Sequence, residues 1–406
     1  MEDADLPSFT QEKPSRFQGE HVAFRFDPEA WAEAVRQVTA VFRNYDQIFS
    51  NSFTVTAEKY THYYVNSEGS EVVQEQTYFN WWMDAGSRAD DGLEVSNFRR
   101  SLGLEIQEKP DLPALVAEAK ALAEELLKLR AAPALSPYNG PAILAPQVTG
   151  VLFHEAIGHR LEGERMRNPG EGFTFKDKVG QQVIPTFLTV TDDPTRRTFD
   201  SSTLVGYYHY DQEGVPAQAI TLIQDGILKN YLMSRTPIKG FDLSNGHGRS
   251  DGETDPMARM GNLIVTSSQT LDDATLKQKL IELVKKQDKP FGLIIRETLG
   301  GDTRTGREEM QGFRDRPRLI YQVDPATGQE TLVRGVELVG TPLISINKIV
   351  ATGQEMGVFN GYCGAESGYV PVATVAPSVL LEEVELQKSS EKPQRPPILK
   401  PPAFEP

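Results

Sequence analysis

The chain has 406 residues and a formal net charge of −15, with 39% hydrophobic and 24% charged residues. This composition supports folded cores, and the length corresponds to roughly two or three domains of ~150 residues each. The acidic balance argues against a nucleic-acid backbone or an anionic membrane surface as the main partner. A single cysteine excludes an intrachain disulfide, a CxxC redox motif and a cysteine-rich zinc finger.

The sequence shows no targeting signal and no membrane span. The first twenty residues are acidic and lack a basic stretch followed by an apolar one. Apolar runs such as PFGLII at 290–295 are far shorter than the ~20 residues that a membrane helix needs. We therefore expect a cytoplasmic protein without a membrane partner, with export left open if the natural N-terminus is missing.

The first 110 residues are expected to form a small α/β domain. Asp27 and Pro28 supply an N-cap and a first-turn proline, and apolar residues follow at helical spacing. Two β-rich runs, 53–65 and 71–83, flank the turn sequence NSEGS and predict a hairpin.

The next segment, 111–139, is interpreted as a connecting helix and a linker. Residues 113–131 are rich in Ala, Leu, Glu and Lys and form the strongest helix pattern in the chain. A stretch punctuated by proline and glycine, APALSPYNGPAILAP, follows this helix and marks a boundary.

The main domain is predicted at 140–388, where short β-like runs dominate. Helices are expected only at 145–165 and 271–286, and no regular βαβ alternation is present. Strands that outnumber helices in this way favour an α+β fold over a doubly wound sheet. The tail at 389–406 is rich in proline and is expected to be extended.

The segment VTGVLFHEAIGHRLEGER places His154, Glu155 and His159 in an H-E-x-x-x-H pattern. With six histidines in 406 residues, chance predicts about 0.01 such triplets. Apolar neighbours would bury this helix. Burying two histidines and a glutamate costs free energy unless the polar groups share a bonding partner. A Zn²⁺ ion on the two histidines would be such a partner, with Glu155 as the general base that activates water.

The spacing of the two histidines makes a structural demand. Residues five apart on a regular helix point about 140° away from each other, at ~100° per residue. Two such side chains do not converge on one ion. The sequence therefore predicts either a π-type bulge in this helix or a distortion near Gly158.

A zinc site of this type needs a third protein ligand, and two candidates exist. Glu162 follows His159 by three residues and could share its helix face. Cys363 lies in FNGYCGAESGYVPV, which is interpreted as a glycine-rich loop. Both candidates stay open on the residues alone, because a lone cysteine is usually a small buried apolar residue.

Together with other blocks along the chain, the motif HEAIGHRLEGE resembles the TldD/PmbA (TldE) metalloproteases, historically labelled modulators of DNA gyrase. The resemblance covers roughly residues 50–388. Its blocks include NSEG at 66–69, TDDP at 191–194, EGVPAQ at 213–218, PMARMGN at 256–262 and the Cys363 segment.

The resemblance implies a zinc-dependent protease of the TldD-like branch, because the PmbA/TldE-like branch lacks the HExxxH motif. By motif match, His154, His159 and Cys363 would be the zinc ligands and Glu155 the catalytic acid/base, with Glu162 outside the ligand set. The family acts on unfolded peptides held extended in a cavity formed by a dimer. A homodimer or a heterodimer with an inactive homologue is therefore expected. Family members usually begin well before the point matched by residue 28, so part of the N-terminal region is expected to be missing here.

Five further residues are candidates for substrate binding: His209, His247, Arg249, Gly300 and Gly301. The two histidines and the arginine lie in polar, glycine-containing segments. Such groups either bind substrate carbonyls or stabilise an oxyanion, or they are ordinary loop residues, and both interpretations stay open. The run from Gly301 to Glu308 lacks the lysine and the Ser/Thr of a P-loop, which excludes nucleotide binding there. The sequence thus predicts a zinc metallopeptidase acting on unfolded peptides, and the alternative is a non-catalytic peptide-binding or regulatory subunit of a TldD/TldE-type complex.

Overall fold

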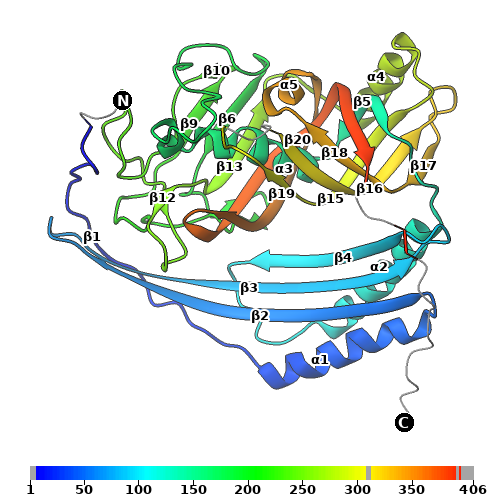
Figure 1. Ribbon diagram of the computed structural model, residues 1–406. Coiled ribbons are helices and arrows are strands. Elements are labelled where there is room, and N and C mark those ends of the chain that lie inside the picture. The colour runs from blue at the N-terminus through cyan, green and yellow to red at the C-terminus, as the bar shows by residue number, and fades with distance from the viewer. Residues whose placement is uncertain (1–5, 308–311, 390–392, 395–406) are drawn as a thin grey trace.

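The computed structural model of the protein describes residues 6–307, 312–389 and 393–394. Figure 1 shows two sheet-based layers: a long curved N-terminal sheet, and a larger sheet-rich part that carries the rest of the chain. Helices and mixed sheets coexist without βαβ alternation, so the predicted α+β fold is confirmed.

The N-terminal sheet is built around one long strand. Strand β3 (Glu71–Arg88) pairs antiparallel with β2 (Ile48–Val65) on one side. On its other side it pairs antiparallel with β4 (Glu94–Gly103) and parallel with β1 (Arg16–Gln18). The predicted hairpin is therefore confirmed, and both of its strands run longer than the sequence pattern indicated.

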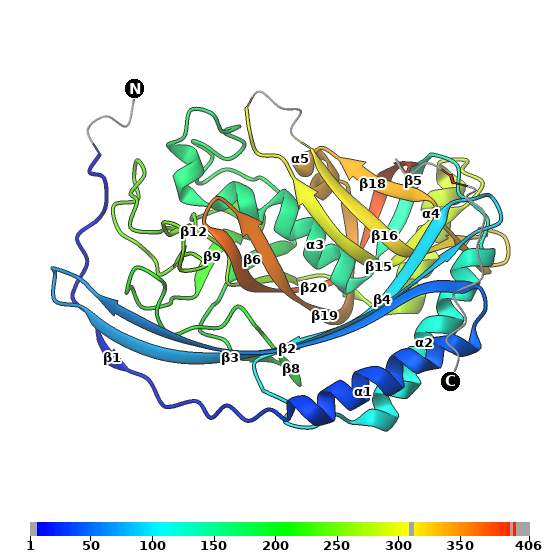
Figure 2. The ribbon, with the colours of Figure 1, turned by 60° about the horizontal axis from the view of Figure 1, so that its bottom comes forward.

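Helices α1 (Pro28–Ala40) and α2 (Leu112–Ala131) cover the face of this sheet that points away from the larger part (Figure 2). The Asp27 side chain accepts a hydrogen bond from the Ala30 N–H at 3.0 Å, which confirms the predicted N-cap. Apolar residues of α2 share one core with α1 and β3, among them Leu115, Ala119, Leu122, Ala123 and Leu126. Helix α2 is thus packed into the N-terminal layer; the domain limits drawn from the sequence stay a prediction.

Within the residues that the structure describes, the C-terminal part contains a sheet of twelve strands. They are β5 (Tyr138–Leu144), β6 (Leu188–Asp192), β9 (Ile220–Gln224), β10 (Ile227–Leu228), β13 (Asn262–Ser267), β14 (Thr270–Leu271), β15 (Gly292–Thr303), β16 (Phe313–Val323), β17 (Glu330–Val333), β18 (Val336–Gly340), β19 (Ile349–Ala365) and β20 (Gly368–Lys388). Strand β20 pairs with both β18 and β5, so the pairings β20–β18–β16–β15–β5 return to β20 and this part of the sheet closes on itself. Two short ribbons flank the sheet: β7 (Thr198–Phe199) with β8 (Ser202–Thr203), and β11 (Gly248–Arg249) with β12 (Met257–Ala258).

Helix α3 (Pro146–Ala156) packs against β15, β19 and β20. From Val148 to Ala156 every residue of this helix is buried, which explains the unbroken apolar run VLF before the motif. The core around α3 includes Leu152, Phe153 and Ile157, each at most 1% exposed. A rigid, fully packed helix thus carries the predicted motif.

Two further helices border the sheet. Helix α4 (Asp273–Lys286) confirms the helix predicted at 271–286 and packs through Leu276, Leu280 and Val284. The six-residue helix α5 (Pro342–Asn347) is not predicted by the sequence pattern, since its residues continue an apolar β-like run.

The open face of the N-terminal sheet lies against the C-terminal part (Figure 2). Tyr78 and Leu102 of the sheet form a buried cluster with Val205. The side-chain amides of Gln74 and Gln76 donate to backbone carbonyls of residues 210 and 207, both at 2.7 Å. The sheet therefore forms a wall beside the region that carries the motif.

Within the described residues, no helix has both the length and the apolar character needed to cross a membrane. The proline-rich tail predicted from residue 389 falls almost entirely outside the described residues, so its predicted extended form stays a prediction.

Candidate metal centre

The motif helix ends in the middle of the motif. His154 and Glu155 occupy the last turn of α3, which stops at Ala156, and His159 lies on the 3₁₀ helix η2 (Gly158–Leu161). The predicted distortion near Gly158 is therefore present, and the alternative, a π-type bulge, does not form. The change of helix type brings the rings of His154 and His159 to a centroid separation of 4.9 Å, nearly perpendicular at 87°.

A side chain at the point where the helix changes would collide with a buried neighbour. A Cβ atom on Gly158 would lie 1.9 Å from the Sδ atom of Met260, a side chain that is itself fully buried. The motif therefore favours a small residue at position 158, between its two histidines, because Met260 packs against that position.

Replacing Gly158 with alanine is expected to lower the free energy of unfolding by about 1–3 kcal/mol, because the core must open around Met260. Thermal unfolding measures this, with Gly103→Ala as the control, since no atom lies within 4 Å of a Cβ built there. The double variant Gly158→Ala/Met260→Ala tests the cause, because removing the clash should make the two changes non-additive. Strict additivity would show that the contact with Met260 is irrelevant.

Cys363 lies on strand β19, which corrects the interpretation of its segment as a loop. It pairs with Val370 across a hairpin whose last paired residues are Ala365 and Gly368. One of the glycines that suggested a loop lies under an aromatic ring: a Cβ on Gly364 would lie 2.8 Å from the ring of Tyr369. The strand fixes the backbone of Cys363 firmly opposite helix α3.

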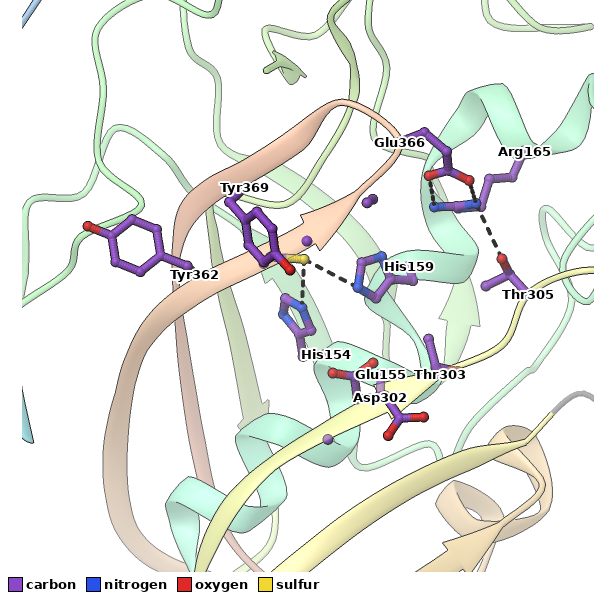
Figure 3. A pocket seen from close by; sticks show the side chains of 14 residues that line it. His154, Glu155, His159, Arg165, Asp302, Thr303, Thr305, Tyr362, Glu366 and Tyr369 are labelled. Carbon is purple, nitrogen blue, oxygen red and sulfur yellow. Dashed lines mark hydrogen bonds and ion pairs between the residues drawn. The ribbon is translucent and has the colours of Figure 1, made fainter. Parts of the chain in front are cut away.

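Cys363 meets both histidines of the motif (Figure 3). Its Sγ atom lies 3.1 Å from Nε2 of His154 and 3.3 Å from Nε2 of His159. The three ligand atoms all lie within 4.8 Å of one another, and the residues are 8%, 7% and 4% exposed for His154, His159 and Cys363. Tetrahedral zinc with Zn–N of ~2.0 Å and Zn–S of ~2.3 Å places its donor atoms about 3.5 Å apart. Two imidazoles and one thiol at these separations fit a zinc ion with three protein ligands.

The pKa values of this group favour a thiolate at Cys363 beside protonated imidazoles. A bound metal would displace the imidazole protons, because histidine binds metals in its neutral form. Burial raises the pKa of the Cys363 thiol, but the two facing imidazoles outweigh burial and hold it well below its usual range. Burial lowers the pKa of His159, and Cys363 and Glu162 reverse this and raise it well above its usual range. The thiolate, which is the form that binds metals, is thus favoured at this position.

Glu162 lies behind His159 and outside the ligand atoms. Its carboxylate is fully buried, with Oε1 at 3.0 Å from Nδ1 of His159 and Oε2 accepting from Nε of Arg165 at 2.8 Å. Burial raises the pKa of Glu162, but His159 and Arg165 outweigh burial and lower it to about 2. A carboxylate in this position orients the imidazole toward a metal. Of the two candidates for third ligand, the geometry brings Cys363 to the histidines and turns Glu162 away.

Glu155 faces the same cavity as the cluster. The cavity measures about 530 Å³ and is bounded by the motif segment, by β15 and by the β19–β20 hairpin. Burial raises the pKa of Glu155, which is 7% exposed. Gly301 of β15 packs against it so closely that a Cβ there would lie 3.0 Å from Cγ of Glu155. The carboxyl group is therefore held in place, and its raised pKa makes it bind a proton more readily than an exposed glutamate does.

The cavity contains residues that the sequence analysis did not single out. Arg165, from the 3₁₀ helix η3 (Gly163–Met166), donates two hydrogen bonds of 3.0 Å to the carboxylate of Glu366 at the hairpin turn. Asp302 and Thr303 of β15 also line it. No local pattern in the sequence indicates that Arg165 and Glu366 meet, because they are separated by 201 residues.

Of the five predicted substrate-binding residues, Gly301 lines the metal cavity and the other four do not. Gly300 precedes it with a φ of 113° and no atom within 4 Å of a Cβ built there. The ring of His209 contacts the hydroxyl of Tyr207 at 2.9 Å.

His247 and Arg249 are both buried; Arg249 belongs to strand β11, and His247 directly precedes that strand. His247 is fully buried, with Nε2 at 3.2 Å from the Asp192 carboxylate. Arg249 is 3% exposed and donates to the carbonyl oxygens of Met260 and Pro371 at 2.6 and 2.8 Å. It also lines a second pocket beside the metal cavity.

The comparisons with known proteins define a class of metallopeptidase. The family model for the PmbA/TldA metallopeptidase C-terminal domain matches residues 137–388, and the model for the central domain matches residues 24–127. The chain belongs to the TldD/PmbA metallopeptidase family.

Named relatives agree with this assignment. The chain is 30% identical to metalloprotease MJ0996 of Methanocaldococcus jannaschii, over 75% of this chain and 63% of that protein. It is 30% identical to the metalloprotease TldD homolog of Haemophilus influenzae, over 68% of this chain and 53% of that protein. It is 25% identical to the zinc metalloprotease TldD homolog of Saccharolobus solfataricus, over 61% of this chain and 51% of that protein. The chain thus spans roughly half to two thirds of the length of these relatives.

The fold is also found in solved structures. TldE from Thermococcus kodakarensis superimposes with a TM-score of 0.63 at 14% identity, over 93% of this chain and 79% of that one. At this identity the likeness concerns the fold alone.

Proposed function

We propose that this chain is a zinc-dependent metallopeptidase that hydrolyses unfolded peptides. The observation that carries the proposal is the convergence of His154, His159 and Cys363, with Glu155 on the same cavity. When bound, a zinc ion would polarise water and the scissile carbonyl as a Lewis acid. The name of the S. solfataricus relative, a zinc metalloprotease, supports this choice of metal.

Glu155 is the residue that moves protons in this scheme. It takes a proton from the attacking water and gives it to the nitrogen of the leaving amine as the C–N bond breaks. Its buried position and raised pKa suit both steps, since a carboxyl group that is too acidic holds a proton poorly. Gly301 keeps the backbone of β15 close enough to restrict the Glu155 side chain to this cavity.

Two strand edges support an extended substrate. Among the described residues, β19 pairs only with β20 from Met356 to Ala365, so its opposite edge has no strand partner. Strand β15 likewise pairs only with β16 from Gly301 to Thr303. Both edges border the cavity, and an extended peptide can add to such an edge through main-chain hydrogen bonds. An unfolded chain offers free backbone N–H and C=O groups along its whole length, which favours unfolded substrates.

A dimer, with a second copy or an inactive homologue, is part of the proposal. The β2–β3 hairpin exposes Tyr63 and Val65 at its tip, with 74% and 76% of their surface accessible. Exposed apolar groups of this size often mark protein contacts. Analytical ultracentrifugation of the wild type and of Tyr63→Ser/Val65→Ser tests this part by itself, because a hairpin-mediated dimer should dissociate in the double variant.

The catalytic proposal is tested on the purified chain. Elemental analysis is expected to give about one zinc per chain, and the zinc-loaded protein should cleave an unfolded protein but not its folded form. A chelator should abolish cleavage, and added zinc should restore it. Stoichiometric zinc with peptide binding but no cleavage would favour the non-catalytic peptide-binding subunit instead.

A further inference from the structure

A further cavity, of about 400 Å³, lies where strand β4 of the N-terminal sheet meets the C-terminal part, and we call it the arginine pocket. Its walls come from β4, β15, β16 and β19, from the start of helix α3 and from Ser202. Among the described residues, it shares no lining residue with the metal cavity. The charged residues that line it are Arg99, Arg100, Glu297 and Arg318.

Arg100 occupies a position on β4 that is directed toward the C-terminal part. Side chains two apart on a strand share a face, so Arg100 lies between Phe98 and Leu102 on one face of β4. Phe98 and Leu102 are 8% and 9% exposed, and Leu102 packs against Val205 of the C-terminal part. Arg100 itself is half-buried. A charged side chain thus stands in a row of apolar side chains at the contact between the two layers.

Within the part of the chain that the structure describes, the Arg100 side chain makes no hydrogen bond and no ion pair. Its Cζ atom lies 4.1 Å from the centroid of the Phe359 ring, a contact that covers one flat face of the guanidinium and leaves its N–H groups free to donate. Unlike Nε of Arg318, its nitrogens are not enclosed, so they stay open to the pocket. Burial lowers the pKa of Arg100 to about 10, and no carboxylate of the described residues offsets this effect. Because a charge withdrawn from water is unfavourable without a partner, this position favours an anionic ligand.

The other charged groups at the pocket are already paired. Nη2 of Arg318 contacts the carboxylate of Glu297, which lines the pocket, and Nη1 lies 3.4 Å from Glu125. Arg99 lies on the opposite face of β4 and pairs with carboxylates of helix α2. A basic side chain in the pocket would therefore meet the unopposed charge of Arg100, whereas a carboxylate would pair with it through two N–H groups.

The arginine pocket lies a measurable distance from the metal cavity along three elements that line both. Helix α3 lines the two cavities at Gln147 and Glu155, which are about 12 Å apart at 1.5 Å per residue. Strand β19 lines them at Phe359 and Cys363, about 13 Å apart, and β15 lines the arginine pocket about 10 Å before Gly301, both at ~3.3 Å per residue. An extended peptide covers 10–13 Å with about three or four residues.

The unpaired edge of β19 spans this distance. Among the described residues it extends from Met356 to Ala365, where β19 pairs only with β20. Phe359 and Cys363 lie on the same face of the strand, so the ring beneath Arg100 and the sulfur of the cluster are directed to the same side. A peptide that adds to this edge at the metal cavity therefore extends toward Arg100.

We propose that the arginine pocket binds a carboxylate of the substrate at Arg100, three or four residues from the cleaved bond. The carboxylate is the C-terminus of the peptide or the side chain of a glutamate or aspartate, because a guanidinium pairs with the same two oxygens in each. This inference rests on the proposed peptidase function and names one feature of its substrates.

The test uses unfolded peptides in which Glu, Gln or Lys is moved one residue at a time along both sides of the cleaved bond. With zinc-loaded protein, kcat/KM is expected to be about tenfold higher for Glu than for Gln when the residue lies three or four positions away on one side, and equal for the two next to the bond. Lys should be no better than Gln at any position. Peptides that end at the same distance with a free or an amidated C-terminus show which source of carboxylate the pocket accepts, and a preference for either one supports the inference.

Arg100→Gln removes the charge and should abolish the difference between the Glu and Gln peptides, whereas Arg100→Lys keeps the charge and should retain part of it. Arg25→Gln is the matched control, since Arg25 is exposed in the segment before α1, outside the pocket. Because Arg100 has no side-chain hydrogen bond or ion pair to lose among the described residues, Arg100→Gln should unfold at the wild-type temperature. A carboxylate preference that persists in Arg100→Gln, with the same value as in Arg25→Gln, would overturn the inference.

Equilibrium binding of the same peptides to Glu155→Gln, with and without Arg100→Gln, separates this inference from the proposed function. Cleavage by the wild type with no carboxylate preference at any position, in rate or in binding, overturns the carboxylate site and leaves the peptidase. Carboxylate-dependent binding that Arg100→Gln abolishes, together with a wild type that cleaves nothing, supports the site and overturns the peptidase. Absence of both cleavage and carboxylate-dependent binding overturns both.

Discussion

Replacing Glu155 with glutamine is expected to lower kcat for peptide cleavage by about 10²- to 10⁴-fold while the protein keeps its zinc. Glutamine has nearly the shape of glutamate but cannot take a proton from water. The cluster of His154, His159 and Cys363 does not include the Glu155 side chain, so the metal content should not change. Single-turnover cleavage of an unfolded peptide and elemental analysis of the same sample measure the two effects together.

Glu355→Gln is the matched control for this variant. Glu355 is exposed on β19, and the same chemical change there removes a carboxylate from the chain without touching the cavity. Cleavage at the wild-type rate by fully metal-loaded Glu155→Gln would falsify the assigned role of Glu155. Loss of zinc from Glu155→Gln would instead place its carboxylate among the ligands, contrary to the arrangement of the cluster.

The motif and its structural demand were predictable because both depend on residues close in sequence. His154, Glu155 and His159 lie within six positions, so helix geometry alone predicts that a regular α-helix cannot bring the two histidines together. In the structure, the α-helix is followed by a 3₁₀ helix that begins at Gly158, and this change brings the two histidines together. What local geometry could not indicate is the reason for the glycine, because Met260 comes from a distant segment.

The placement of Cys363 shows where prediction from sequence stops. The glycines near it, Gly361 and Gly364, are typical of loops, and the strand that contains them is evident only after β19 and β20 pair. Strand β5 is likewise not predicted by its local sequence, because Gly140 and Pro141 are typical of a linker. It is stabilised by pairing with β15 and β20, both far away in sequence. Tertiary pairing overrides local preference in both segments.

The residues predicted to bind substrate show a further limit. His247 lies in a polar, glycine-containing segment that looks like a surface loop, yet it is fully buried against Asp192, 55 residues away. Arg165 and Glu366 are separated by 201 residues, and no local pattern predicts that they pair. In each case the partner decides the role of the residue, and a single sequence does not reveal the partner.

Cys363→Ser is expected to weaken zinc binding by more than about 100-fold, whereas Glu162→Gln should weaken it by about 10- to 100-fold. Serine at neutral pH stays protonated and is a poor ligand, so the ion would keep only the two imidazoles. Glutamine at 162 can still contact Nδ1 of His159, so the ring keeps its orientation but loses the negative charge behind it. Competition with a chromogenic chelator measures both dissociation constants.

The two variants together distinguish a ligand from a residue that orients one. Breaking the buried pair of Glu162 and Arg165 also removes stability, so circular dichroism must first show that Glu162→Gln is folded at the temperature of the assay. A reversed order, with tight binding by Cys363→Ser and none by folded Glu162→Gln, would make Glu162 the third ligand and would contradict the cluster seen here. The expected order instead makes the zinc affinity depend on strand β19, and therefore on the hairpin that β19 forms with β20.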